Sequence, residues 1–300
     1  MAAGLRRYLL IVVPYAWLLV FFLAPFFIVL KISLSDLAVA MPPYTPTFDP
    51  SAGWEGFKAF ISQLDFESYI FLATDSLYVN AFFSSLQIAV LSTFLALLVA
   101  FPMAYGMARA PDWLRPLLVM GVILPFWTSF LIRVYAWVGI LRSEGLLNQF
   151  LIWTGIISEP LQIMNTPVAV YIGIVYSYLP FMVLPIYATL EKMDESLLEA
   201  AIDLGCSRVK AFWLVTLPLA MPGIIAGCFL VFIPAMGEFV IPELLGGSRT
   251  LMMGKTLWNE FFSNRDWPVA SAVAIVLLLT LVVPIVIFQR QAERQQEAGR

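Results

Sequence analysis

The sequence contains no histidine, only two cysteines and few charged residues. Histidine is the commonest general base and a common metal ligand, so its absence argues against hydrolytic chemistry by this chain. Cys206 and Cys228 are too few for a disulfide framework and lack C-x-x-C spacing, so we interpret both as small buried side chains. A net charge of -3 without a basic run argues against nucleic-acid binding. No G-x-x-x-x-G-K-[ST] phosphate loop is present, which excludes an ATPase of that class.

Apolar residues dominate what is present. They make up 61% of the chain, charged residues make up 12%, and the mean hydropathy is +0.88, which places the chain in a lipid bilayer. A membrane-crossing helix needs about 20 apolar residues. Six segments have this length, at about residues 8–32, 77–105, 116–141, 166–190, 219–242 and 269–288. The sequence therefore predicts an all-α integral membrane protein with six transmembrane helices, in one domain over residues 8–290.

The distribution of lysine and arginine predicts the orientation of these spans. If residues 1–7 are cytoplasmic, the inner segments carry ten basic residues and the longer outer segments carry six. Basic residues favour the cytoplasmic side. We therefore expect an outer loop at 33–76, a cytoplasmic loop at 191–218 and a cytoplasmic tail at 291–300. The outer segments also hold eleven acids, which would concentrate a cation at that face.

The loop at 191–218 is amphipathic, unlike the apolar segments around it. Ser196 and Glu199 have the spacing of a capping box, which predicts a helix beginning near Leu197. Gly205 is expected to end that helix. A second short helix is expected after Ser207, running as far as the dipeptide at 217–218. We expect this helix, turn and helix to lie parallel to the membrane.

The same loop resembles the EAA signature of binding-protein-dependent ABC importer permeases, written E-A-A-x3-G-x9-I-x-L-P. The matching residues are Glu199, Ala200, Ala201, Gly205, Leu217 and Pro218, and Val215 stands where isoleucine is usual. Valine for isoleucine is a conservative apolar exchange. The length of the pattern makes a coincidental match on an ordinary surface helix the weaker interpretation.

Four further segments resemble polyamine importer permeases. They are PFWTSFLIRVY from Pro125, LPFMVLP from Leu179, GEFVIPELLGG from Gly237 and NRDWP from Asn264. The last two favour the putrescine-type subunit over the spermidine-preferring one. The resemblance covers nearly the whole chain and implies the MetI-like fold of ABC permeases, in the inner membrane of a bacterium, with the loop at 33–76 in the periplasm.

This resemblance also implies partners. They are a second, homologous permease subunit that completes a heterodimer, two cytoplasmic ATPase subunits that bind ATP and magnesium, and a periplasmic polyamine-binding protein. No cofactor is expected on this chain itself. In that family the EAA loop forms a coupling helix that docks in a groove of the ATPase. The expected contact residues here are Glu199, Ala200, Ala201 and Gly205.

A polyamine carries several ammonium groups, so its pathway is expected to combine carboxylates with aromatic faces. Glu238 is the one acid inside a predicted span, near the outer end of the fifth, and an ionisable group there is a functional candidate. The alternative is a structural salt bridge to Arg133, the one base inside a span. The candidate aromatic lining is Trp127, Tyr135, Tyr176 and Tyr178, although interfacial or core packing explains each of these residues alone. Glu243 and Asp266 are candidate contacts for the binding protein.

Several alternatives stay open from sequence alone. An ABC permease for an amino acid, iron or an anion keeps the class and changes the cargo. An ion-driven carrier would need inverted repeats, which we do not find, and a membrane enzyme lacks clustered catalytic groups. Gly223 and Gly227 form a G-x-x-x-G motif for close helix packing, either within the chain or with the partner permease. Interior prolines such as Pro125 are interpreted as ordinary helix curvature.

Overall fold

The computed structural model describes residues 11–47, 53–247 and 250–298, with side chains as far as residue 286. The described chain is almost entirely helical, which confirms the predicted all-α class; its strands are two residues long each. The helices group into two compact units. Unit 1 comprises Met1–Asn80 with Thr256–Arg300, and unit 2 comprises Ala81–Lys255.

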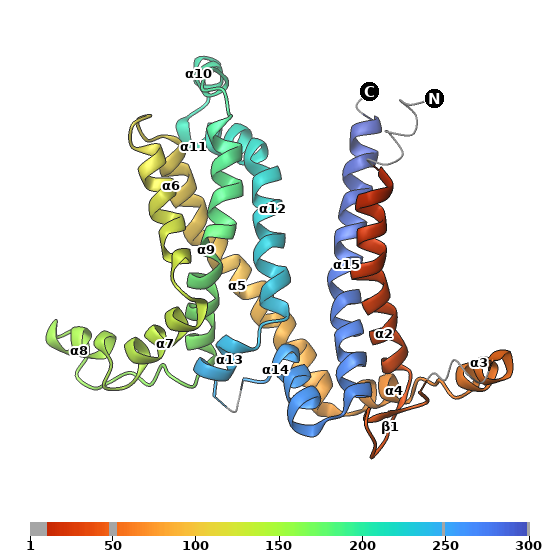
Figure 1. Cartoon of the computed structure of the whole chain (residues 1–300). Helices are drawn as coiled ribbons and strands as arrows, with labels where there is room; N and C mark the ends of the chain where they lie inside the picture. The colour runs from red at the N-terminus through yellow and green to blue at the C-terminus, as the bar shows by residue number, and fades with distance from the viewer. Residues whose placement is uncertain (1–10, 48–52, 248–249, 299–300) are drawn as a thin grey trace. The chain divides into compact units, whose positions relative to one another are not determined.

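Unit 1 is built on two long apolar helices that pack side by side (Figure 1). The first runs over Ile11–Ser33 and includes the π-helix η1 (Leu19–Leu23) and α2 (Ala24–Ser33). The second is α15 (Trp267–Ala298), which follows the π-helix η5 (Asn259–Asn264). Between them in the sequence lie an antiparallel pair of strands, β1 (Asp36–Leu37) and β2 (Tyr44–Thr45), and the helices α3 (Gly53–Ser62) and α4 (Glu67–Thr74).

Unit 2 contains most of α5 (Ser76–Ala108) together with α9 (Pro167–Glu191) and α12 (Leu217–Met236). These three helices enclose a core of small and branched apolar side chains, among them Ala96, Ala100, Val183 and Ile224. The shorter elements are α6 (Arg115–Ile123), the 3-10 helix η3 (Leu124–Trp127), α7 (Phe130–Leu141), α8 (Leu146–Trp153), α10 (Ser196–Asp203), α11 (Arg208–Ala211), the π-helix η4 (Phe212–Thr216) and α13 (Val240–Leu245). The helix α14 (Met253–Trp258) links the two units in sequence.

The G-x-x-x-G motif packs within the chain. A Cβ at Gly223 would lie 2.5 Å from the Thr189 hydroxyl oxygen and 2.6 Å from the Pro185 carbonyl oxygen. A Cβ at Gly227 would lie 2.7 Å from the sulfur of Met182. Both neighbours belong to α9, so the glycines allow α9 and α12 to approach closely, as small residues do in membrane helices. In this structure the motif therefore mediates helix packing within the chain.

Five helices of the described chain are long and apolar enough to cross a membrane, and a bent pair of helices makes a sixth candidate. That pair, Arg115–Trp127 and Phe130–Trp153, occupies the region of the third expected span and is bent by 90°. A single continuous helix over 116–141 is therefore wrong. Thr128 and Ser129 adopt extended conformations at the break. The Thr128 backbone N–H and hydroxyl both donate to the carbonyl of Pro125, which closes the 3-10 turn and ends the helix.

The fifth expected span also has different ends. Helical structure runs without interruption from Arg208 to Met236, so the expected stop at the Leu217–Pro218 dipeptide is wrong. Pro218 lies at the junction of the π-helix η4 and α12, where the helical hydrogen-bond register changes and the missing N–H of proline is tolerated. The preceding π-turn brings the Leu217 N–H onto the Phe212 carbonyl. At the other end, residues 237–239 are not helical, and α13 follows as a separate helix.

Candidate functional site

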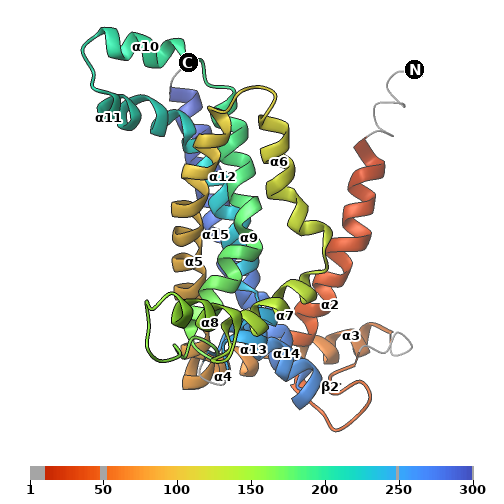
Figure 2. The ribbon, with the colours of Figure 1, turned by 90° about the vertical axis from the view of Figure 1, so that its left-hand side faces the viewer.

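The first candidate site is the helix–turn–helix formed by α10 and α11, at one end of α9 and α12 (Figures 1 and 2). Gly205 has φ +86°, a left-handed conformation that favours glycine. Its N–H donates to the Ile202 carbonyl over 2.9 Å, and the Cys206 N–H donates to the Ala201 carbonyl over 3.0 Å. These two bonds form a Schellman motif. The expected end of the helix at Gly205 is confirmed.

The start of α10 differs from the expected capping box. The Ser196 side chain does not cap the helix; its backbone N–H donates to the Asp194 carboxylate over 2.9 Å. That bond lowers the pKa of Asp194 below its ordinary value. The capping box was wrong because an acid two residues earlier offers a stronger acceptor than a hydroxyl. The second helix does begin as expected, since the Ser207 hydroxyl accepts the Lys210 N–H over 3.3 Å.

Within the loop, α10 is tied to the helix bundle by one ion pair, whereas Phe212 further along packs against Phe101 and Tyr105 of α5. Arg109, at the end of α5, forms an ion pair with Glu195 over 2.7 Å. A cavity of about 280 Å³ lies beneath α10, and Glu199 lines it together with Leu198 and Ile202. No residue of α10 is buried, and the side chains of Leu197 and Leu204 are 47% and 88% exposed. The loop therefore presents an apolar helical surface that the described chain does not cover.

The second candidate site surrounds Glu238, at the opposite end of α9 and α12. Glu238 is only 6% exposed, but it follows α12 instead of lying within it. One carboxylate oxygen accepts the backbone N–H groups of Phe239, Val240 and Ile241 over 3.1, 2.9 and 3.3 Å. The other oxygen accepts the hydroxyl of Tyr178 on α9. Glu238 therefore caps the first turn of α13, where a negative charge is favoured by the helix dipole.

Arg133 does not form the alternative salt bridge with Glu238, because the backbone of α13 and Tyr178 already occupy that carboxylate. Arg133 lies on α7, is 9% exposed and places its guanidinium 4.5 Å from the centre of the Phe126 ring. Its Nε and Nη1 have no acceptor among the described residues. A buried guanidinium with unpaired donors is costly, and stacking on an aromatic ring offsets only part of that cost.

The other expected pathway aromatics are not gathered around Glu238. Tyr178 is the one that contacts it. Trp127 and Tyr135 are largely exposed, and Tyr176 packs edge-on against Trp137 with 5.3 Å between ring centres. Tyr176 also lines an apolar cavity of about 540 Å³ between α5, α6 and α9, whose lining carries no charged side chain. In the described conformation, the aromatic residues therefore form no continuous lining.

The two expected contacts for a binding protein are both engaged within the chain. Glu243 pairs with Lys255 over 2.8 Å. Asp266 accepts the N–H of Val269 over 3.0 Å and so caps α15. Burial raises the pKa of Asp266, and the nearby charge of Glu260 adds to this effect.

Two acidic features of unit 1 were not predicted from the sequence. Glu260 is 8% exposed and accepts hydrogen bonds from Tyr78 over 2.9 Å and Asn264 over 2.8 Å. A cavity of about 370 Å³ is lined by the carboxylates of Asp36, Glu67 and Asp266. These three residues come from distant parts of the chain, so no local pattern connects them.

The fold defines a class, a helical membrane protein with an exposed helix–turn–helix loop between two of its long apolar helices. The chain belongs to the family of binding-protein-dependent transport system inner membrane components, whose model matches residues 7–294. This membership confirms the resemblance expected from the EAA signature. It also confirms that the protein is an inner membrane component of a transport system.

Individual relatives agree with this assignment. The chain is 44% identical over 216 residues to the spermidine/putrescine transport system permease protein PotB of Escherichia coli strain K12, covering 72% of this chain and 78% of that one. It is 41% identical over 280 residues to PotB of Haemophilus influenzae, covering 93% and 92%. These relatives are transport permeases and not enzymes.

Solved structures match the fold. A bacterial ABC transporter for import of the acidic polysaccharide alginate has a chain that aligns with a TM-score of 0.71 at 16% identity, covering 98% of this chain and 96% of that one. At this identity the likeness concerns the fold alone. It confirms the predicted architecture of an ABC importer permease.

Proposed function

We propose that this chain is the transmembrane permease subunit of an ATP-driven importer that moves polyamines, putrescine and spermidine, across the bacterial inner membrane by alternating access. The observation that carries the proposal is the 41% identity to a spermidine/putrescine permease over 93% of the chain. Sequence similarity at this level along almost the whole length includes the helices from which a cargo pathway is built. The acidic outer segments agree with a cationic cargo.

In this proposal, α10 is the coupling helix and ATP hydrolysis takes place on a partner. Glu199, Ala200, Ala201 and Gly205 contact an ATPase subunit that binds ATP and magnesium. The support is the exposed apolar surface of α10, which has no buried residue. Small side chains at positions 200 and 201 permit close approach of another surface. Two such ATPases, a second homologous permease and a periplasmic polyamine-binding protein complete the complex.

The proposed orientation has both termini and α10 in the cytoplasm, so that Glu238 lies toward the periplasm. The charge distribution between inner and outer segments supports it. A single cysteine introduced at exposed Ser196 should react with a membrane-impermeant maleimide only after the cytoplasmic side is opened. A cysteine introduced at exposed Glu55 on α3 should react in intact spheroplasts. These labelling experiments need a background in which Cys206 and Cys228 have been replaced. The reverse pattern would overturn the orientation.

We also propose that Glu238, with Tyr178, contributes to the cargo pathway, and that Trp127, Tyr135 and Tyr176 reach it in another conformation. The support is the burial of a carboxylate at the end of α12. To bind an ammonium group, Glu238 has to exchange its bond from Tyr178. Glu238→Gln should lower polyamine uptake while the assembled complex persists. Wild-type uptake by this variant would remove the carboxylate from the pathway.

Glu243 and Asp266 remain proposed contacts for the binding protein, although both are engaged within the chain. More than half of the Glu243 side chain is exposed beyond its pair with Lys255, and this exposed part is what supports the proposal. Glu243→Gln should weaken capture of the loaded binding protein by the purified complex.

The decisive experiment for the cargo is uptake of labelled putrescine and spermidine by cells that contain all partners, with and without this chain. Uptake that depends on the chain supports the proposal and gives the preference between the two polyamines. If both uptakes are independent of the chain, the cargo is another small solute, such as an amino acid, iron or an anion. A relative in Agrobacterium fabrum, 29% identical over 220 residues, is a sulfoquinovosyl glycerol permease, so cargo differs within the family.

A further inference from the structure

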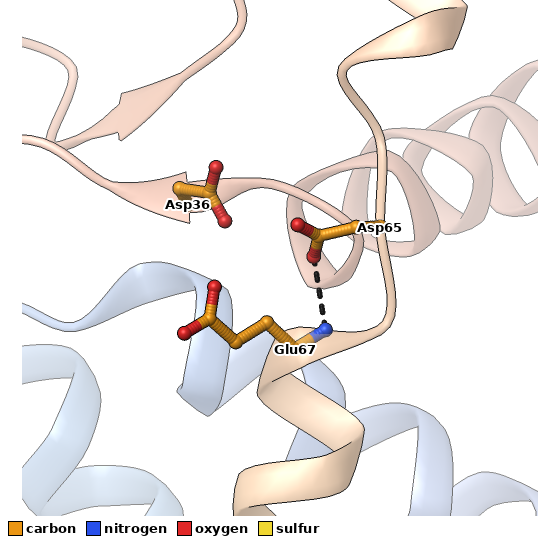
Figure 3. A group of neighbouring side chains, drawn as sticks. All are labelled: Asp36, Asp65 and Glu67. Atoms are coloured by element: carbon orange, nitrogen blue, oxygen red, sulfur yellow. Dashed lines mark hydrogen bonds between the residues drawn. The ribbon is translucent and has the colours of Figure 1, made fainter.

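Arg133 on α7 carries a buried positive charge that no acid of the described chain neutralises. Its side chain is nine-tenths buried, and its Nε and Nη1 atoms are shielded from water and have no hydrogen-bond partner among the described residues. The carboxylates of Asp36, Asp65 and Glu67 in unit 1 also face a common space (Figure 3), but two of them are exposed, so water can solvate them. A buried charge without a partner in a membrane protein is costly and points to a function.

The contact that holds the guanidinium spans the break in the bent helix pair. Phe126 lies on η3, before the break at residues 128–129, and Arg133 lies after it on α7. The guanidinium carbon is 4.5 Å from the centre of the Phe126 ring and 5.8 Å from that of the Phe130 ring. An aromatic ring gives the N–H groups no oxygen acceptor, so this contact is weaker than a bond to a carboxylate. The guanidinium is therefore available to a stronger partner.

Glu238 is the acid that the fold offers as this partner. The helix α7 packs against α8, α9 and α13. There is no acid on α8, and the acid of α9, Glu191, lies at the last residue of that helix and accepts the hydroxyl of Tyr187. On α13, Glu243 pairs with Lys255. Glu238, which caps α13, is buried and has no ion pair among the described residues.

Tyr178 connects the two charges. Its hydroxyl donates to Glu238, and the charges of both Glu238 and Arg133 act on it. Aromatic contacts link the same residues, because Phe126 packs edge-on against Phe181 with 5.2 Å between ring centres, and Phe181 lies 6.3 Å from the ring of Tyr178. Three backbone N–H groups occupy one oxygen of Glu238, whereas Tyr178 alone binds the other. The bond from Tyr178 is therefore the one that a cation can replace.

We propose that Arg133 competes with the cargo for Glu238. During transport its guanidinium leaves Phe126, replaces the Tyr178 hydroxyl on the carboxylate and so expels the ammonium group bound there. A guanidinium attached to the chain has a high effective concentration, and it binds carboxylates strongly. In the described conformation the two residues are apart, so the carboxylate can accept cargo. The inference rests on the proposed place of Glu238 in the cargo pathway and makes Arg133 a positioning residue for release.

Uptake kinetics test this competition. Arg133→Gln should lower kcat of polyamine uptake by about fivefold or more without raising KM, because a carboxylate without a competitor releases ammonium more slowly. Arg133→Lys keeps a cation and should retain most of kcat. The matched control is Arg142→Gln, an exposed arginine directly after α7, which should leave both constants unchanged. If the glutamine variant does not assemble, Arg133→Met replaces it, since methionine keeps an apolar stem against Phe126.

The effect should disappear when the carboxylate is absent. In a Glu238→Gln background, we expect Arg133→Gln to change the remaining kcat by less than about twofold. If Arg133→Gln lowers uptake equally in both backgrounds, Arg133 acts on the fold and not on Glu238, and the proposal is wrong. A lysine variant that is no better than the glutamine variant would also contradict it.

A cycle of unfolding temperatures tests the pair without cargo. Arg133→Gln, Glu238→Gln and the double variant are compared in the purified complex, both without nucleotide and after trapping with ATP and vanadate. The coupling should appear in one of these states only, as a non-additive shift of about 2–4 °C. Coupling in neither state, or equal coupling in both, would overturn the proposal. If the wild-type complex takes up neither polyamine, the cargo assignment fails, while this cycle still decides whether Arg133 and Glu238 pair.

Discussion

The two ends of the α9–α12 pair satisfy their polar groups in different ways. At the end with α13, Glu238 is buried, three backbone N–H groups and a tyrosine hydroxyl bind it, and Glu243 pairs with Lys255. At the end with α10, no residue of that helix is buried and a single ion pair, Arg109–Glu195, ties it to α5. At the first end, which we call the complete end, the carboxylates of Glu238 and Glu243 are satisfied within the chain. The second end leaves an apolar surface exposed among the described residues.

Substitution of Gly254 should have the largest effect on stability, because this glycine packs against the backbone of the complete end. A Cβ there would lie 2.3 Å from the Gly237 carbonyl oxygen and 2.7 Å from the Glu238 carbonyl oxygen, which are backbone atoms that cannot turn away. Gly254→Ala should destabilise the protein by about 1–3 kcal/mol. The control is Gly139→Ala on α7, where a Cβ meets no atom within 4 Å and a helix gains up to about 1 kcal/mol. Thermal unfolding in detergent measures both. Equal shifts would show that the two positions are packed alike.

Substitution of Gly205 tests the open end. Gly205→Val forces a branched side chain into a left-handed conformation, at a cost of about 1–2 kcal/mol, and should disturb the exposed turn alone. We expect normal insertion and assembly but a loss of at least tenfold in uptake per ATP hydrolysed. Gly205→Asn is the control, since asparagine tolerates this conformation and should retain most of the uptake. Coupled uptake by the valine variant in vesicles would contradict the assignment of this turn to the docking surface.

Two substitutions of Glu238 separate its capping function from its charge. Glu238→Gln keeps an oxygen for the three N–H groups, whereas Glu238→Ala leaves them uncapped. The alanine variant should lose about 0.5–2 kcal/mol of stability, and the glutamine variant clearly less. Differential scanning fluorimetry compares the two. If both variants unfold at the same temperature, the cap contributes little to stability. The two ends of the bundle would then differ less than their geometry indicates.

The Arg109–Glu195 pair should contribute little to stability. Both side chains are partly exposed, at 28% and 65%, and exposed ion pairs typically contribute about 0.2–1 kcal/mol. A double-mutant cycle with Arg109→Gln and Glu195→Gln measures the coupling energy from thermal unfolding. The coupling should fall as salt rises. A salt-independent coupling above this range would mean that the open end is more rigid than its exposure indicates.

The smallest effect is expected for Asp194, before α10. The N–H of Ser196 lowers its pKa, so the ionised form is favoured in the folded state. Its stabilising contribution is present above the ordinary value of 3.8 and is lost as the pH falls through the lowered pKa. Asp194→Ala should therefore slightly reduce stability at neutral pH and leave it unchanged in strong acid. Unfolding at a series of pH values checks this, and a difference that grew toward low pH would have the wrong sign.

Local sequence signals predicted the open end better than the complete one. Gly205 and Ser207 act within a few residues of themselves, so the end of α10 and the start of α11 could be predicted. The residue that caps the start of α10 was harder to predict, because Asp194 and Ser196 are both possible caps for the same helix start. Exposed segments have few tertiary contacts to override such signals.

Tertiary contacts decided the features that the sequence did not predict. The segment at 116–141 is apolar apart from Thr128, Ser129 and Arg133, and its hydropathy does not reveal that the chain turns by 90° after Trp127. The partner of Glu238 depends on where α9 places Tyr178, sixty residues earlier in the chain. The acidic cavity of unit 1 likewise joins residues 36, 67 and 266. Only packing shows which of these distant groups meet.

The unbroken helical run from Arg208 to Met236 has a mechanical consequence. Its 29 residues form a rod about 40 Å long. A tilt of about 5° around the middle of such a rod displaces each end by about 2 Å in opposite directions. That displacement equals most of a hydrogen-bond length, enough to separate a donor from its acceptor. If the run tilts as one body, a displacement at Arg208 is matched by one of similar size and opposite direction next to Glu238, whose carboxylate accepts the hydroxyl of Tyr178 on α9.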